Sequence, residues 1–208
     1  MQASSREGEA YLGAMAAAAN FAWANRHMLA HTTREAVAAA LGTSVAKTGM
    51  GLVFDVAHNL AKVEEHRVGG HSRRLCVHRK GATRAFGPGH PALPADLRPI
   101  GQPVLIPGSM GTASWVLRGV TDNPAFATAA HGAGRLMSRS AAKKTRGGRE
   151  VMADLEAEGI AVRPGSVSLL AEEAPFAYKD VDEVVEVCRL AGLAAPLARL
   201  RPIGVVKG

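Results

Sequence analysis

The sequence contains few cysteines and few aromatic residues, and it lacks a long apolar run. Only Cys76 and Cys188 occur among its 208 residues. Two cysteines do not make a disulfide framework, so a reducing compartment is the simpler interpretation. No stretch contains the ~18 consecutive apolar residues that a membrane span needs, and residues 1–11 lack the apolar core of a signal peptide. We therefore expect a cytoplasmic protein that does not contact a membrane.

The composition is otherwise that of a globular protein with a moderate positive charge. Apolar residues make up 47% and charged residues 21% of the chain, which argues against general disorder. Aromatic residues account for only 4%, so a core built on stacked rings is not expected. Lys and Arg number 25 against 18 Asp and Glu, which leaves a formal net charge of +7. This excess allows an anionic partner such as RNA, DNA or a nucleotide, but it does not select among them.

Two helices are expected near the N-terminus. Apolar and small residues recur at nearly helical spacing over residues 7–30, which predicts a long amphipathic helix. A second helix is expected over residues 32–41, because Thr32 and Glu35 have the spacing of a capping box and Gly42 can end the helix.

Strands are expected farther along the chain, and together the elements indicate an α+β fold of mixed sheets covered by helices. Residues 51–58 predict a short strand, residues 59–67 a helical turn, and residues 75–86 a strand or hairpin interrupted at Gly81. The remaining expected elements are strands at residues 104–106 and 113–120, a helical region at 138–159 broken at Gly147-Gly148, a helix at 181–193 and a strand-like tail at 198–208. No Gly-rich turn of the dinucleotide-binding type follows a strand, which argues against a doubly wound nucleotide fold.

A histidine ends the apolar run at residues 51–58. Neutral imidazole is a common ligand of Mn, Zn and Fe, so His58 is a candidate metal ligand. The adjacent Asn59 could hold a phosphate or a nucleophile. A histidine with only a structural role is the alternative.

Two glycine-containing segments could bind an anion. Residues 107–114 (PGSMGTAS) offer backbone N–H groups and hydroxyls that can surround a phosphate or a base edge. They lack the Lys-Ser/Thr ending of a P-loop, and a tight turn between strands is the alternative. In residues 131–135 (HGAGR), small neighbours leave His131 sterically open, and a neutral histidine nitrogen is a competent nucleophile toward phosphorus. Arg135 can pair with phosphate, whereas a loop with an incidental surface histidine is the alternative.

Basic residues extend these segments. Residues 135–149 and 78–84 are rich in Lys and Arg, which suits either a solvated surface or a track for RNA phosphates. Lys207 lies next to the end of the chain, but the apolar residues before it suggest that the tail is packed and that Lys207 is held in a site.

Together these segments resemble the RtcB family, the GTP- and manganese-dependent RNA-splicing ligases. The stretches that carry the resemblance are YLGAMAAAANFAWANR, FDVAHNLAK, VHRKGATRAFGPG, GQPVLIPGSMGTASWVL, AAHGAGRLMSRSAA, EAPFAYKDVDEVV and RPIGVVKG. They follow the family's order across almost the whole chain, which makes the resemblance specific.

The resemblance implies a mechanism and a set of site residues. Such ligases form a guanylylated histidine with GTP and Mn²⁺ and pass the guanylate to an RNA 3′-phosphate, which arises from a 2′,3′-cyclic phosphate. A 5′-hydroxyl then seals the strand and releases GMP. On the matching positions His131 would be the catalytic nucleophile and His58 a manganese ligand. The residues expected to contact GMP or GTP are His58, Asn59, Pro107, Gly108, Ser109, Met110, Ser114, His131, Gly132, Ala133, Gly134 and Lys207. The residues expected to contact RNA are Arg79, Lys80, Arg84, Arg135 and Tyr178.

Several features of the family are not found in the sequence. The family has an Asp and a Cys metal ligand, a GNHF-type motif and an HSGSRG-type segment, and one metal histidine is too few where about three protein ligands are expected. We therefore expect residues 1–208 to be the C-terminal portion of an RtcB-like domain whose N-terminal half is missing, through truncation, an incomplete reading frame or a split protein. Apolar surface that the missing half would cover should then be exposed.

The resemblance leaves the activity of this chain open. It could be a ligase part that needs the missing half and an archease-type activator, a non-catalytic RNA- or nucleotide-binding remnant, or a metal-dependent phosphohydrolase using His58 and His131.

Overall fold

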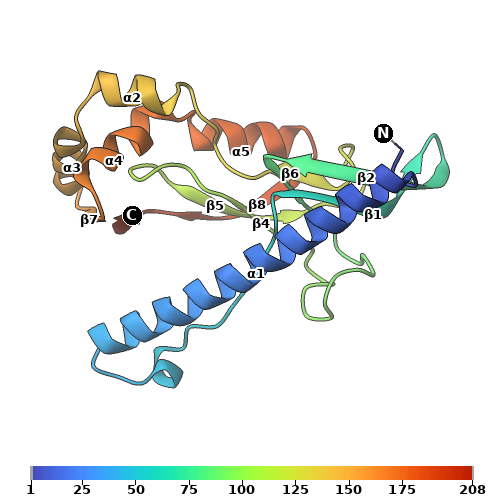
Figure 1. Cartoon of the computed structure of the whole chain (residues 1–208), viewed down its shortest axis with the longest axis horizontal. Coiled ribbons are helices and arrows are strands. Elements are labelled where there is room, and N and C mark those ends of the chain that lie inside the picture. Colours follow the sequence, from blue (N-terminus) through green and yellow to red (C-terminus); the bar gives the residue numbers. More distant parts are fainter. Residues whose placement is uncertain (1, 208) are drawn as a thin grey trace. The chain divides into compact units, whose positions relative to one another are not determined.

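The computed structural model describes residues 2–207, and the chain divides into two compact units (Figure 1). Unit 1 is Met1–Lys80 and unit 2 is Gly81–Gly208. Although one helix of unit 1 is long, no helix within residues 2–207 combines the length and the apolar character that crossing a bilayer requires.

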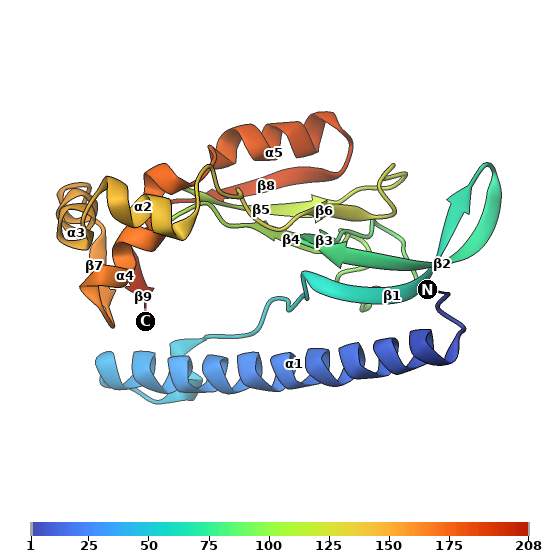
Figure 2. The ribbon, with the colours of Figure 1, turned by 45° about the horizontal axis from the view of Figure 1, so that its top comes forward.

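Unit 1 consists of one long helix, a returning segment and a hairpin. The helix α1 (Arg6–Ala40) is followed by a 3-10 turn (Val45–Thr48), and the hairpin strands are β1 (Asn59–Val68) and β2 (His71–Lys80). After α1 the chain turns back and runs beside the helix toward β1 (Figure 2). The sulfur of Met15 on α1 accepts a hydrogen bond from the Ala61 backbone N–H of β1 at 2.9 Å, which ties the helix to the hairpin.

The two predicted N-terminal helices are a single helix, so the predicted boundary at Thr32 is wrong. The hydroxyls of Thr32 and Thr33 donate to the carbonyls of Met28 and Leu29, 3.1 and 2.7 Å away. These bonds to the preceding turn replace the expected cap and let the helix continue. The end before Gly42 is confirmed, because that glycine has a φ of +60°.

The predicted order of strand and helical turn at residues 51–67 is wrong. Residues 51–57 form neither helix nor strand, and β1 begins at Asn59. Antiparallel pairing with β2 accounts for this, since it joins every residue from Asn59 to Val68 to a partner in Lys80 to His71. The long-range pairing outweighs the weak local preference of a charged segment.

Unit 2 contains three small sheets with helices. Its elements are β3 (Ala82–Arg84), β4 (Pro103–Ile106), β5 (Ser114–Gly119), β6 (Thr128–Ala130), α2 (Arg139–Thr145), α3 (Gly148–Ala157), β7 (Ala161–Pro164), α4 (Val167–Leu170), 3-10 turns at Ala171–Glu173 and Pro175–Ala177, α5 (Val181–Leu190), β8 (Ala194–Leu200) and β9 (Gly204–Lys207). The sheets are β4-β5-β8 and β3-β6, both antiparallel, and β7-β9, which is parallel.

The α+β class is confirmed, but the sheets differ from the prediction. Within residues 2–207 no sheet combines parallel and antiparallel strands, so the mixture lies between sheets and not inside one. Three of the four sheets in the described part of the chain have only two strands, and a single pairing is either parallel or antiparallel. The predicted strands and helices after residue 100 are otherwise found close to their expected places, except that the strand-like tail is divided between β8 and β9. The elements β6, β7 and α4 were not predicted.

Two apolar cores hold unit 2 together. In the first, α5 covers one face of β4-β5-β8 (Figure 2), with Val181, Val185 and Cys188 against Val104 and Leu117. The second core forms where α3, α4 and β7 meet, and its members are Met110, Val151, Leu155, Ile160, Val162, Leu170 and Ala174. Both cores lie beside the segments that the sequence analysis marked for chemistry.

Candidate nucleotide site

His131 directly follows the short strand β6. Because Ala82 on β3 pairs with Ala130 on β6, the next residues along each strand, Gly81 and His131, face each other. A Cβ built on Gly81 would lie 3.5 Å from Nε2 of His131. Glycine at this position, with a φ of +67°, therefore leaves one ring nitrogen of the half-buried imidazole clear of a side chain from the opposite strand.

The two glycine-containing segments are adjacent in the structure. The Ala133 backbone N–H donates to the Pro107 carbonyl at 3.0 Å, and a Cβ on Gly132 would lie 3.6 Å from the same oxygen. This contact places the loop after β6 against the loop between β4 and β5. The sequence predicts that both loops belong to one nucleotide site, and the tertiary structure brings them together.

The loop between β4 and β5 is held by its own side chains. Ser109 and Thr112 exchange hydrogen bonds, because each hydroxyl accepts from the other's backbone N–H, at 2.7 and 3.2 Å. A Cβ on Gly108 would lie 2.1 Å from the Ala113 carbonyl oxygen. Gly108 is therefore required by the turn itself, which is the tight-turn alternative raised from the sequence. The Met110 side chain is buried in the second core, so any contact it makes with a nucleotide would involve its backbone.

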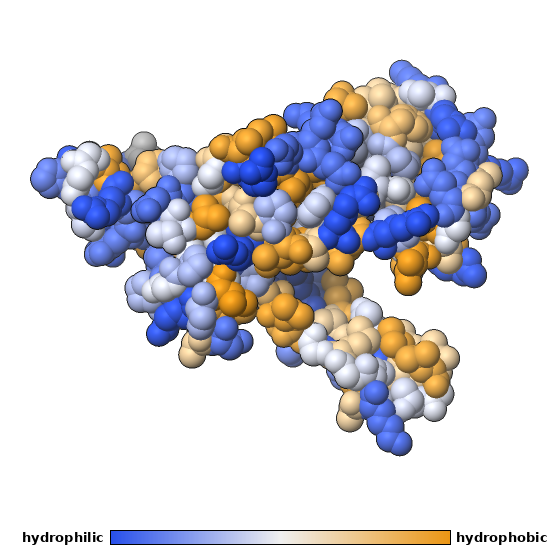
Figure 3. Space-filling model, turned by 180° about the vertical axis from the view of Figure 1, so that it is seen from behind, coloured by the Kyte–Doolittle hydropathy of each residue, from blue (hydrophilic) through white to orange (hydrophobic). Residues whose placement is uncertain are grey.

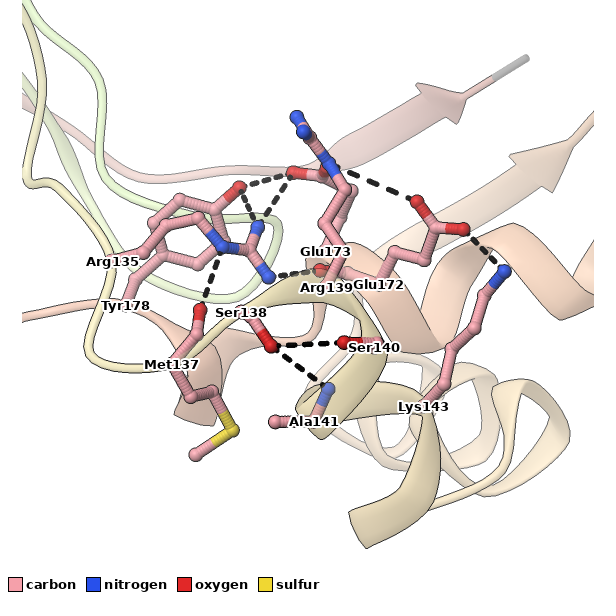
Figure 4. A network of polar contacts seen from close by, with 10 residues as sticks. All are labelled: Arg135, Met137, Ser138, Arg139, Ser140, Ala141, Lys143, Glu172, Glu173 and Tyr178. Carbon is pink, nitrogen blue, oxygen red and sulfur yellow. Dashed lines mark hydrogen bonds and ion pairs between the residues drawn. The ribbon is translucent and has the colours of Figure 1, made fainter.

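Arg135 and Tyr178 lie side by side in a polar network (Figure 4). They form an antiparallel bridge, and the guanidinium carbon of Arg135 lies 4.8 Å from the centre of the Tyr178 ring. Arg135 also donates to the Tyr178 hydroxyl at 3.0 Å, to the Met137 carbonyl at 3.0 Å and to the Glu172 carbonyl. All three guanidinium nitrogens thus hold the loop after His131 in place, while a phosphate or RNA contact by Arg135 stays a prediction.

Glu173 is the acid at the centre of this network. Its carboxylate accepts from the Tyr178 hydroxyl and from Arg139 Nε at 3.1 Å. Burial alone would raise the pKa of Glu173, but these two hydrogen bonds and the charges of Lys207 and Arg135 outweigh it and lower the pKa. Conversely, burial, the hydrogen bond to Glu173 and the negative charge of Glu173 together raise the pKa of Tyr178.

Lys207 lies at the end of β9 and is half-buried. Lys207 pairs with Pro164 on β7, and its backbone carbonyl accepts a hydrogen bond from the Gly165 N–H at 2.6 Å. The tail is thus bonded to β7, but Ile203 and Val206 are 84% and 89% exposed. The prediction that its apolar residues are packed holds only for Val205, which contacts the second core. Because its charge acts on Glu173, Lys207 belongs to the same electrostatic environment as Tyr178 and Arg135.

The two remaining predicted residues of unit 2, Ser114 and Arg84, have separate roles. Ser114 begins β5 opposite Leu200 of β8. Arg84 stacks over the Phe86 ring at 4.6 Å and donates to Gln102 Oε1 at 3.2 Å. A contact between Arg84 and RNA stays a prediction.

Four predicted residues lie at the open end of the hairpin in unit 1. His58 is exposed at a bend directly before β1, and Asn59 pairs with Lys80 across the hairpin. The fourth, Arg79, is 5% exposed and donates two hydrogen bonds to Glu64, at 3.0 and 2.7 Å. This pairing gives Arg79 a structural role in the hairpin and disfavours the predicted RNA contact.

Comparison with known proteins identifies the family. The model of the family described as "tRNA-splicing ligase RtcB" matches residues 1–208. The chain belongs to the RtcB family. The resemblance drawn from the seven sequence stretches is thereby confirmed.

Curated RtcB proteins match nearly the whole chain. The tRNA-splicing ligase RtcB of Archaeoglobus fulgidus is 55% identical over 206 residues, which are 98% of this chain and 43% of the relative. The RNA-splicing ligase RtcB of Mycobacterium tuberculosis is 55% identical over 204 residues, covering 98% of this chain and 46% of the relative. The chain therefore spans less than half the length of these RtcB relatives.

The residues of this RtcB-family chain do not by themselves fit the manganese site that the family resemblance implies. Within residues 2–207 no group of three or more His, Cys, Asp and Glu side chains is placed to hold a metal ion. His58 alone cannot fix the coordination of Mn²⁺. His58 as a manganese ligand stays a prediction, and no chemical step is derived through the metal.

Sequence reasoning missed two residues of this RtcB-family site. Glu173 stands in the EAPFAY stretch, but no periodicity or motif marks it until folding places it against Tyr178. Gly81 was noted only as an interruption in a hairpin, although the pairing of β3 with β6 sets it against His131. In both cases the signal is a long-range contact that local sequence does not contain.

Proposed function

We propose that this chain supplies the nucleotide-carrying part of an RNA ligase that joins 2′,3′-cyclic phosphate or 3′-phosphate ends to 5′-hydroxyl ends through a guanylylated His131. The observation that supports this most is the setting of His131. It combines an imidazole that faces a glycine with a hydrogen-bonded contact between the loops at Ala133 and Pro107. Family membership supports the ligase class.

The first step would use His131 as the nucleophile. A neutral ring nitrogen attacks the α-phosphorus of GTP, the P–N bond forms, and the α–β anhydride bond breaks to release pyrophosphate. Histidine titrates near neutral pH, so a neutral ring is available at pH 7. The backbone N–H groups of Gly108, Met110, Gly132 and Gly134 are proposed to orient the guanylate, together with Lys207, because the N–H groups of Ser109 and Ala133 already donate within the loops. The contact between Asn59 and the nucleotide stays a separate prediction for unit 1.

The remaining three steps would act on RNA. A 2′,3′-cyclic phosphate is first opened by water to a 3′-phosphate, whose oxygen attacks the guanylate and breaks the P–N bond, so that His131 is restored. The 5′-hydroxyl of the second RNA then attacks the 3′-phosphate, loses its proton and expels GMP. Exposed Lys80 suits an RNA phosphate contact better than Arg79 or Arg135, whose guanidinium groups already bond to the protein.

The test is guanylylation of the protein. The 208-residue chain is incubated with Mn²⁺ and labelled GTP, alone and after co-expression with the part of the Archaeoglobus fulgidus relative that it does not span. Acid-labile label on the protein, expected with that part, must disappear in His131→Ala. It must persist in His71→Ala, an exposed histidine at the hairpin turn that serves as the matched control.

The outcomes separate the alternatives. Label that survives His131→Ala overturns the nucleophile assignment. No label in either sample, together with salt-sensitive RNA binding, favours a binding remnant without catalysis. Release of phosphate from RNA ends without any protein label would favour a phosphohydrolase.

A further inference from the structure

The outer face of α1 is apolar and exposed. This face recurs at helical spacing over residues 14–28 and consists of Ala14, Ala17, Ala18, Phe21 and Met28, all of them exposed, with Asn25 as its polar member. Phe21 and Met28 are 77% and 60% exposed. The packed side of the helix is a different stripe, where Leu12 and Met15 are half-buried and Met15 bonds to β1. The helix thus has two apolar sides, and unit 1 uses only one.

The same part of α1 carries no charge. Residues 10–25 include no Asp, Glu, Lys, Arg or His, although α1 extends over several exposed turns there. Helices that face water on one side normally place charged residues on that side, whereas helices that are apolar all around are buried. A Cβ on Gly13 would meet no atom within 4 Å, so another backbone can approach closely here.

Exposed apolar side chains continue beyond the helix. Figure 3 shows them over the lobe formed by the C-terminal end of α1 and the segment that follows it. Leu41, Leu52 and Val53 are among the exposed residues of that segment. A groove of about 670 Å³, lined by Trp23, Leu52 and Phe54, opens between α1 and the segment, and Arg34 also lines it.

We infer that the outer face of α1 is the docking surface for the part of an RtcB-family polypeptide that this chain does not span. The chain matches its relatives over 98% of its own length but covers only 43–46% of theirs. In those relatives, more than half of the protein remains to cover a helix of this kind. The fitting partner surface is apolar and nearly uncharged opposite Phe21 and acidic near Arg34. This inference rests on the proposed function, in which that part completes the ligase.

The experiment co-expresses the tagged 208-residue chain with the non-matching part of the Archaeoglobus fulgidus relative. We expect the two polypeptides to co-purify as a 1:1 complex, with amide exchange over residues 10–29 slowed at least tenfold. Phe21→Asp combined with Met28→Asp should abolish co-purification. Val187→Asp, on the exposed outer side of α5, should leave it intact, because Val187 is 63% exposed and lies in unit 2. Circular dichroism checks that α1 persists in the double variant, and Met28→Lys alone provides a milder variant that should weaken the complex.

Each other result overturns the inference. In the first two, the wild-type pair fails to co-purify, or the double variant co-purifies as well as the wild type. The other two results give the face another partner: a dimer of the chain that the double variant disrupts, or binding to phosphatidylcholine vesicles through the same face. Failure of the proposed function looks different. If the complex forms but carries no guanylate, the ligase chemistry is wrong and the docking surface stands. If guanylylation is unaffected by the double variant, the docking surface is wrong and the ligase chemistry stands.

Discussion

Unit 1 and unit 2 differ in how they bury their apolar side chains. Among the described residues 2–80, Ala38 is the only buried apolar side chain, although the unit contains a helix of 35 residues. Unit 2 instead has two apolar cores, one under α5 and one between α3, α4 and β7. Since burial of apolar surface is the main stabilising contribution to folding, unit 2 carries its own stability and unit 1 depends more on polar pairs and on what covers it.

The predicted chemistry follows the same division. His131, the loop at Pro107 and Lys207 are anchored to the cores of unit 2, which suits residues that must keep a fixed geometry. His58, Asn59 and Lys80 lie at the end of a two-stranded hairpin, which has little stability of its own. The comparison therefore predicts that mutations in the two units will change the free energy of unfolding unequally. Trp23 lies in unit 1 and Trp115 in unit 2, so each unit has one fluorescent probe.

The largest effect is expected from Leu117→Ala. Leu117 is fully buried in the first core of unit 2, so its truncation should lower the free energy of unfolding by about 4 kcal/mol. Leu29 of α1 is 59% exposed, so Leu29→Ala should change the free energy of unfolding by less than about 0.5 kcal/mol. Urea unfolding of a Trp23→Phe protein reports unit 2, and that of a Trp115→Phe protein reports unit 1. Equal losses from the two leucine variants would contradict the comparison.

Glu64→Gln tests whether polar pairing replaces an apolar core in unit 1. Glu64 accepts two hydrogen bonds from Arg79. The side chains of Arg79 and Glu64 are only 5% and 8% exposed. Removing the charge leaves a buried guanidinium without its counter-charge, and we expect a loss of about 3 kcal/mol in the unit 1 signal. Glu65→Gln, at the exposed next residue, is the control and should be nearly neutral. A loss below about 1 kcal/mol for Glu64→Gln would mean that the pair does not hold the hairpin.

Two glycine substitutions should have opposite signs in the two units. Gly108→Ala places a Cβ 2.1 Å from a backbone oxygen, so unit 2 should lose about 2 kcal/mol through the forced backbone shift. Gly13→Ala meets no atom within 4 Å on α1, and it should stabilise the helix by about 1 kcal/mol. The same urea experiments measure both changes. A neutral or stabilising Gly108→Ala would refute the assignment of Gly108 to a crowded turn, and a destabilising Gly13→Ala would refute the open space at Gly13.

A small and pH-dependent effect on stability is expected from Glu173→Gln, which sharpens the comparison at the site itself. Because the pKa of Glu173 is lowered in the folded protein, its contribution is present above the ordinary glutamate pKa and is lost as the pH falls through the folded value. The wild type should exceed the variant by about 1 kcal/mol at pH 7 and lose this advantage in acid.

Tyrosine absorbance provides a second readout for Glu173→Gln. Tyr11 and Tyr178 are the two tyrosines of the chain, so a Tyr11→Phe background isolates Tyr178. The raised pKa of Tyr178 should fall toward its ordinary value in Glu173→Gln, because the negative charge and the hydrogen bond of Glu173 contribute to the rise. Glu172→Gln, which removes the neighbouring carboxylate, should leave that pKa unchanged. An unshifted Tyr178 titration would remove Glu173 from the centre of the network.

Much of the fold after residue 100 could be predicted from the sequence, because its signals are local. The break at Gly147-Gly148 and the amphipathic α5 depend on glycine and on helical periodicity, and both were found as predicted. The hairpin in unit 1 was mispredicted because β1 is stabilised by pairing with β2, a contact that short-range patterns do not encode. Thr32 was misread as a helix cap because a hydroxyl can serve either as a cap or as a donor to the preceding turn.

The sequence by itself determined the family of this chain and predicted which residues its chemistry would use. Seven stretches in order carried that information, since residue identity and spacing survive without a structure. Only the tertiary structure decided what surrounds those residues. Pairing of β3 with β6 set Gly81 against His131, folding brought Glu173 to Tyr178, and the packing within unit 1 left Phe21 and Met28 exposed. Each of these depends on contacts between residues far apart in the chain, which no local pattern specifies.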